Sequence, residues 1–86
     1  MNKYEPININ DWKVIMYTGY WIEDNLIFGP RESGKFWIED NYIYGPKMSG
    51  EFWIKKGIIY GPKDSGKFWI RDDFIYGPRK NLPWFE

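Results

Sequence analysis

Residues 36–51 read FWIEDNYIYGPKMSGE, and this stretch decides the fold because the chain repeats it. Related copies precede and follow it with a period of sixteen residues, and the four copies occupy residues 20–78. A fixed period of this length indicates one supersecondary unit that packs against its own copies, since a single unit cannot bury its apolar face alone. Two columns define the repeat: the tryptophans Trp21, Trp37, Trp53 and Trp69, and the aromatic residues before each Gly-Pro, which are Phe28, Tyr44, Tyr60 and Tyr76.

Each copy contains two short segments rich in aromatic and β-branched residues, such as residues 36–38 and 42–44. Segments of this length and composition are typical of strands and are too short for helices. The pattern predicts a β-hairpin with a tight two-residue turn in every copy, because the second turn residue is always of a type that tolerates positive φ. These second turn residues are Asn25, Asn41, Gly57 and Asp73.

The copies are joined by a motif that reads Gly-Pro-basic-x-Ser-Gly, as in residues 45–50. Proline fixes φ for a turn and donates no hydrogen bond to a sheet, while the closing glycine accepts positive φ. We expect this motif to be a return loop. The repeats then form an antiparallel up-and-down meander of about eight strands.

Two flanking segments extend the repeats. Residues 12–17 form a candidate leading strand, with Thr18-Gly19 in the place of Ser-Gly, and residues 83–85 begin where a fifth Phe-Trp pair is due. We expect one all-β domain, with a leading segment and strand at 1–19, four repeats at 20–78 and a capping segment at 79–86. A total of about eight to ten short strands predicts a curled sheet or a small barrel. The alternative is an open single-layer sheet, alone or dimerised, which leaves two edges unpaired.

Alternation along the strands assigns each side chain to one face of the sheet. In the second copy Phe36, Ile38 and Ile43 share a face that carries no charge in any copy, so we assign this face to the core. The opposite face pairs each Trp with the aromatic residue across the hairpin, as Trp37 with Tyr44. Two interpretations of these pairs stay open. They form a packing ladder worth roughly 0.2–1 kcal/mol per pair, or an interaction surface, since Tyr and Trp are enriched where proteins associate.

Charge follows the same period, although twelve basic and twelve acidic residues leave no net charge. A base follows every Gly-Pro, and acidic pairs occupy the hairpin turns except at Lys55-Lys56. Because alternate turns of a meander lie at opposite ends, we expect a basic rim and a largely acidic rim. These rims either keep the turns solvated or steer a charged partner. The bases are Arg31, Lys47, Lys63 and Arg79, and the acidic pairs are Glu23-Asp24, Glu39-Asp40 and Asp72-Asp73.

The chain contains no histidine and no cysteine. It therefore lacks the usual general base near neutral pH, a thiolate nucleophile and the common ligands of zinc. Ser33, Ser49 and Ser65 recur, but each precedes a glycine in a return loop, and we interpret them as turn residues. We expect no catalytic residue, no cofactor and no metal site, and so a protein that is not an enzyme.

The sequence carries no apolar segment of the kind found in signal peptides or membrane spans, so we expect a cytoplasmic protein without membrane contact. Our first functional hypothesis is a non-enzymatic protein-binding module, most concretely a small inhibitor or immunity-type protein that neutralises a toxin or enzyme by covering its surface. The alternatives are carbohydrate binding through exposed Trp and Tyr, and single-stranded nucleic-acid binding, which the zero net charge disfavours. Self-association also stays open. The candidate partner-binding residues are Trp21, Trp37, Trp53, Trp69, Phe28, Tyr44, Tyr60, Tyr76, Arg31, Lys47, Lys63 and Arg79.

Overall fold

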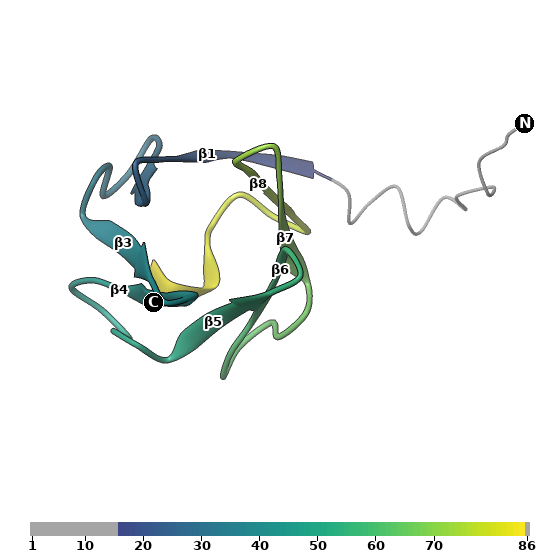
Figure 1. Cartoon of the computed structure of the whole chain (residues 1–86). Helices are drawn as coiled ribbons and strands as arrows, with labels where there is room; N and C mark the ends of the chain where they lie inside the picture. Colours follow the sequence, from purple (N-terminus) through teal and green to yellow (C-terminus); the bar gives the residue numbers. More distant parts are fainter. Residues whose placement is uncertain (1–15, 86) are drawn as a thin grey trace, which may run out of the picture.

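The computed structural model describes residues 16–85 and shows a small closed β-barrel of antiparallel strands in chain order (Figure 1). The last strand pairs with the first, which rules out the open single-layer sheet. No strand edge is therefore left unpaired among the described residues. The strands are β1 (Met16–Glu23), β2 (Leu26–Phe28), β3 (Phe36–Glu39), β4 (Tyr42–Tyr44), β5 (Phe52–Lys55), β6 (Ile58–Tyr60), β7 (Phe68–Arg71) and β8 (Phe74–Gly77).

The four hairpin turns have the predicted two-residue form. In the second repeat Glu39 pairs with Tyr42, and the turn residues Asp40 and Asn41 have φ of 52° and 68°. The turn residues of the other three hairpins also have positive φ, which matches the right-handed twist of the flanking strands. The return loops are confirmed as well, since the closing glycine of each loop, such as Gly50 with φ of 78°, lies in the left-handed region.

Successive hairpins are joined by one repeated hydrogen bond at the turn end of the barrel. The Ile38 amide donates to the Asn25 carbonyl at 2.8 Å, and the Ile54 and Ile70 amides make the same bond one repeat further on. The Ile22 amide donates to the Asp73 carbonyl at 2.8 Å and so completes the ring. Four equivalent junctions give the barrel an approximate four-fold symmetry.

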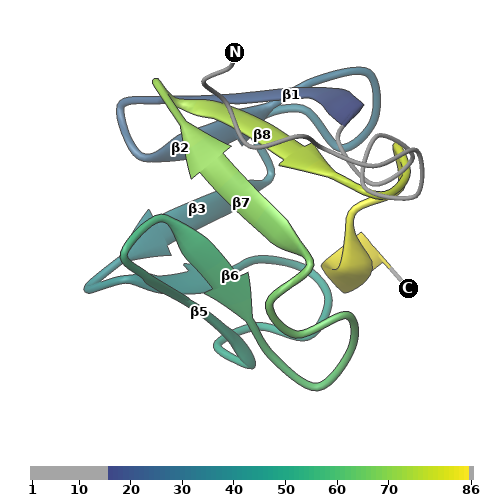
Figure 2. The same cartoon turned by 90° about the vertical axis from the view of Figure 1, so that its right-hand side faces the viewer.

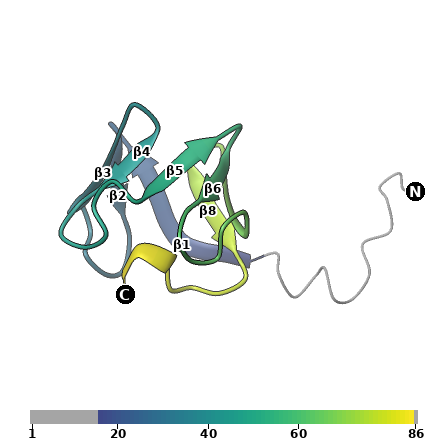
Figure 3. The same ribbon diagram turned by 90° about the horizontal axis from the view of Figure 1, so that it is seen from below.

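Thr18 and Gly19 do not form a return loop between two strands. Met16 and Tyr17 belong to the same strand as the first repeat, and the register shifts between Tyr17 and Tyr20, so Thr18 and Gly19 form a bulge instead of a turn. Figure 3, seen from below, shows β1 running next to β8. The rest of the expected leading strand, residues 12–15, lies outside the described residues.

Thr18 replaces a backbone donor at this closing seam. In the other repeats the closing glycine amide donates to an isoleucine carbonyl, as Gly50 does to Ile43 at 2.8 Å. At the seam the Thr18 hydroxyl donates to the Ile75 carbonyl at 2.7 Å and accepts from the Tyr20 amide at 3.2 Å. The buried hydroxyl therefore satisfies a carbonyl that the bulge would otherwise leave without a partner.

The barrel interior is filled by the face that we assigned to the core. Phe36 is 1% exposed whereas its neighbour Trp37 is 42% exposed, and the same alternation holds around the ring. An aromatic layer and an isoleucine layer are fully buried, and a third layer of isoleucines packs against them near the hairpin turns. The first two layers contain Tyr20, Phe36, Phe52 and Phe68, and Ile27, Ile43, Ile59 and Ile75, while the third contains Ile22, Ile38, Ile54 and Ile70.

The capping segment is a short 3₁₀ helix, η1 (Pro83–Phe85), and the expectation of a further strand there is wrong. All eight strands already have two neighbours, so a ninth has no edge to join. The segment instead folds into the ring and closes the end where the return loops lie (Figures 1 and 2). Phe85 packs on Tyr20 and Phe36 with ring centroids 5.3 and 5.4 Å apart, and Trp84 packs on Phe52 at 5.6 Å.

We expect Thr18→Val to lower the free energy of unfolding by about 1–3 kcal/mol, because it keeps the shape but leaves the buried Ile75 carbonyl unpaired. Thr18→Ser retains the hydroxyl and is the matched control, with a loss below about 1 kcal/mol. Urea unfolding followed by circular dichroism measures both. Equal stability of the valine and serine variants would contradict a role for the hydroxyl at the seam.

We expect Trp84→Ala to be strongly destabilising, by about 3–5 kcal/mol, because it empties the closed end of the barrel. The indole Nε1 of Trp84 is buried without a hydrogen-bond partner in the described structure. Trp84→Phe removes this unpaired donor and keeps most of the ring, so its loss should be much smaller. Thermal unfolding of the two variants tests the assignment, and comparable losses would argue against a cap that acts through packing.

Candidate functional site

The outer surface of the barrel carries the predicted aromatic pairs. Each tryptophan stacks on the aromatic residue across its own hairpin, with centroids 5.9–6.1 Å apart and planes inclined by 13–28°. Trp21, Trp37 and Trp53 nevertheless remain 38–42% exposed, and Trp69 is half-buried. The pairs therefore pack as a ladder and still present ring surface to solvent. We call these eight residues the aromatic girdle: Trp21, Phe28, Trp37, Tyr44, Trp53, Tyr60, Trp69 and Tyr76.

A further column of the same surface was missed by the sequence analysis. Across each junction a residue of one hairpin lies beside the tryptophan of the next, as Tyr42 lies beside Trp53. Tyr42 and Phe74 are 44% and 42% exposed, so they enlarge the apolar surface. Residues that pair across neighbouring strands share a face of the sheet. Applying this rule across the return loop, and not only within a hairpin, would have found them. The column contains Leu26, Tyr42, Ile58 and Phe74.

The seam between β8 and β1 carries a cluster of aromatic side chains on the outer surface. Tyr17 packs edge-on against Phe74 with centroids 5.5 Å apart, and it lies 5.7 Å from Tyr76. These three rings line a hollow of about 230 Å³. Trp21 of β1 pairs with Phe74 of β8 and is also exposed. We call the group of Tyr17, Trp21, Phe74 and Tyr76 the aromatic seam.

Two of the four predicted bases hold the C-terminal segment. The Lys47 Nζ donates to the Phe85 carbonyl at 2.9 Å. The Arg31 Nη1 donates to Asn81 Oδ1 at 3.2 Å, and its guanidinium lies 5.6 Å from the centre of the Phe85 ring. The sequence treats all four bases alike, but the structure gives Arg31 and Lys47 an anchoring role at the closed end of the barrel.

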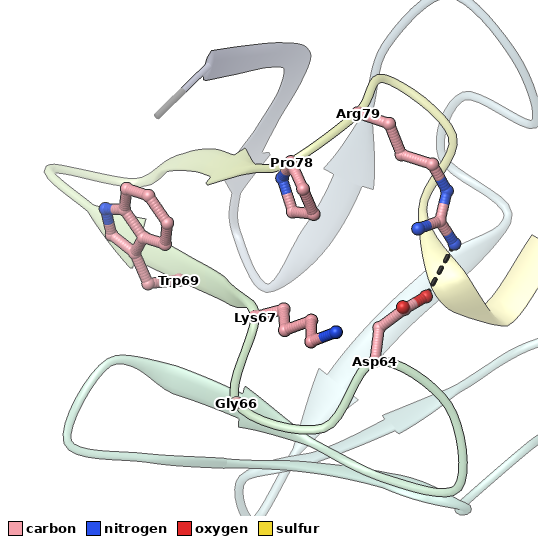
Figure 4. Close-up of a pocket in the computed structure, with 6 residues that line it drawn as sticks. All are labelled: Asp64, Gly66, Lys67, Trp69, Pro78 and Arg79. Atoms are coloured by element: carbon pink, nitrogen blue, oxygen red, sulfur yellow. Dashed lines mark hydrogen bonds and ion pairs between the residues drawn. The ribbon is translucent and has the colours of Figure 1, made fainter. Parts of the chain in front are cut away.

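Arg79 belongs to a different environment, a half-open pocket of about 410 Å³ on the third return loop (Figure 4). Its Nη2 donates to Asp64 Oδ2 at 2.5 Å. This hydrogen bond lowers the pKa of Asp64 below its ordinary value of 3.8; burial opposes the shift, and the charges of Arg79, Lys67 and Lys63 support it. The pocket is lined by Asp64, Gly66, Lys67, Trp69, Pro78 and Arg79.

The hairpin-turn end differs between repeats as the sequence indicated. In the third repeat Lys55 and Lys56 stand where the first two repeats carry acidic pairs. Together with Trp53, Ile58 and Tyr60 they line a shallow hollow of about 420 Å³. The recurring serines lie at the opposite end, where the Ser49 hydroxyl accepts from the Gly45 amide at 3.1 Å. The equivalent bonds of the other two loops confirm that these serines are turn residues.

Comparison of the chain with protein-family models, with curated proteins and with solved structures finds no match. Within residues 16–85 no group of three or more acidic side chains is arranged to hold a metal ion. In the same range, no helix has both the length and the hydropathy needed to cross a membrane.

The Asp64–Arg79 pair predicts a pH dependence of stability. Because the pKa of Asp64 is lowered by folding, the pair stabilises the protein above the ordinary pKa of 3.8, and this contribution is lost as the pH falls through the lowered value. We expect the stability difference between the wild type and Asp64→Asn to shrink as the pH falls from 6 toward about 3.

Urea midpoints at a series of pH values measure this difference. Arg79→Gln removes the donor and should remove the same pH-dependent increment. A difference between wild type and Asp64→Asn that stays constant across the acid range would contradict the prediction.

Proposed function

We propose that this protein is a non-enzymatic protein-binding module, and most concretely a small inhibitor or immunity-type protein that covers the surface of a toxin or enzyme. The observation that carries the proposal is the aromatic girdle, in which rings fixed by stacking remain partly exposed around the barrel. Surface aromatic residues of this kind supply most of the binding free energy in many protein complexes.

The girdle is also rigid before any partner binds. Trp37 is held between Tyr44 across its hairpin and Leu26 across the junction, so little side-chain freedom remains to be lost on binding. The charged rims flank the girdle and supply the polar surround that a protein interface needs. The absence of histidine and cysteine from the whole chain supports a role without catalysis.

Carbohydrate binding is the second candidate, because the exposed indoles recur at equivalent positions around the ring and could each stack on a sugar ring. The junction side chains favour a protein partner over a glycan. Tyr42 and Phe74 add exposed rings to the girdle, and the cores of protein interfaces are enriched in such aromatic side chains. Single-stranded nucleic acid stays third, since the chain carries no net positive charge.

The proposal predicts that Trp37→Ala and Trp53→Ala each weaken partner binding by roughly 2 kcal/mol, or about thirtyfold, if the girdle contains the hot spots. Each loses one stacked pair, so the barrel should lose only about 1 kcal/mol of stability and stay folded. The partner is recovered by affinity purification from the native source and its binding is measured by calorimetry.

Lys35→Ala, an exposed change beside the girdle, is the matched control and should bind as the wild type does. Retention of full affinity by all four Trp→Ala variants would contradict the proposal. A glycan array with the same variants tests the carbohydrate alternative.

A further inference from the structure

The four repeat junctions are alike in their frame and differ in the side chains that surround it. Each repeat has a Trp and a Gly-Pro proline nine residues apart, as Trp69 and Pro78 of this pocket, but the residues around them change. The third return loop supplies Asp64 and Lys67, and Arg79 faces them from the next repeat. The equivalent positions elsewhere hold Glu32, Lys35 and Lys47; Met48, Glu51 and Lys63; and Met16, Gly19 and Arg31.

The pocket at this junction has an apolar end and a charged end. Figure 4 shows Trp69 at one end, Asp64 and Arg79 at the other, and Lys67 extending between them with its amino group toward Asp64. Arg79 already neutralises Asp64 through their hydrogen bond. The second cation, Lys67, gives the lining a net positive charge. The pocket therefore suits a single anionic group attached to an apolar group.

This pocket adjoins the aromatic seam through one stacked pair. Trp69 lines the pocket, Tyr76 lines the seam hollow, and the two rings stack with centroids 5.9 Å apart. Beyond Tyr76, Tyr17 lies a further 5.7 Å away. Side chains on one face of an extended peptide recur about every 6.6 Å. An extended chain can thus place apolar side chains along the seam and an acidic side chain in the pocket.

We propose that the aromatic seam and the Asp64–Lys67–Arg79 pocket together form the docking site for an extended peptide segment of the protein partner, with alternating apolar side chains followed by a carboxylate. This inference rests on the proposed function and deepens it, because it selects one side of the ring and states the partner's chemistry. The second junction carries the same set of charges, but there the Lys47 Nζ donates to the Phe85 carbonyl and the Lys35 Nζ lies 3.9 Å from Glu32. Both cations of that junction are thus engaged within the protein, whereas Lys67 lines an open pocket.

The probe is the blocked pentapeptide Ac-Leu-Ser-Leu-Ser-Glu-NH2, together with its reversed sequence, titrated into the isotope-labelled full chain and followed by NMR. We expect shifts at Lys67, Trp69, Tyr17 and Phe74 for at least one of the two peptides. Replacing Glu by Gln should weaken binding by about fivefold, the effect of one exposed ion pair. Replacing both Leu by Ala should remove binding.

The repeat supplies matched control variants. Lys67→Glu should abolish the shifts, whereas Lys35→Glu, at the equivalent position of the second repeat, should leave them unchanged. Phe74→Ala should weaken binding at least tenfold if the ring is an anchor, whereas Tyr42→Ala, in the same column and equally exposed, should not. Equal effects within either matched pair, or equal binding of the Glu and Gln peptides, would overturn the proposal.

Two further outcomes separate this inference from the function on which it rests. If the purified partner is lost by the Trp37 and Trp53 variants but kept by Lys67→Glu and Phe74→Ala, the inference fails and the proposed function stands. If methyl glucuronide binds the pocket and the peptides do not, the site takes an acidic sugar and the peptide proposal is overturned.

Discussion

The packing of an aromatic ring on a glycine is the contact on which the barrel depends. A Cβ added at Gly45 would lie 2.2 Å from the Phe36 ring, and the other three Gly-Pro glycines are covered as closely by Tyr20, Phe52 and Phe68. Only glycine allows the strand end to pass over the ring at this distance. The contact fixes where the strand stops, and the proline that follows starts the return loop. In each repeat, the same Gly-Pro pair therefore fixes both the position of the buried aromatic ring and the start of the return loop.

Much of this architecture could be predicted from local patterns. The turn residues predict the hairpins because positive φ is a property of two residues, and alternation predicts the inward face because it is a property of one strand. Closure is different, since it depends on the twist summed over eight strands and on the pairing of β1 with β8. Residues 83–85 show the same limit: their composition resembles a new strand, but the closed ring leaves no edge for it, and Trp84 and Phe85 are buried inside instead.

The candidate surface likewise has one part that local sequence patterns predict and one part that they do not. The Trp–aromatic pairs lie within single hairpins, so the sequence predicts them. The residues that complete the surface, such as Tyr42 beside Trp53, lie across a return loop. Alternation alone places them on the outer face, but which tryptophan each one pairs with depends on the geometry of the loop. The roles of Arg31 and Lys47 were equally out of reach, because both depend on the path of the C-terminal segment. The pocket at Asp64 requires two loops of adjacent repeats to meet, which only the folded ring provides.

The repeats are uniform inside and diverse outside, and the two properties have separate physical causes. Four rings and four Gly-Pro turns must meet around one axis, so the inner positions accept almost no variation beyond Tyr20 in place of Phe. Most of the loop and turn positions face solvent and carry no such constraint, so Lys55-Lys56 can replace an acidic pair and Lys67 can stand where the second repeat has Glu51 without disturbing the frame. A symmetric scaffold with uneven charges has distinguishable sides. A partner can therefore recognise one orientation of the ring, although the backbone alone offers four nearly equivalent ones.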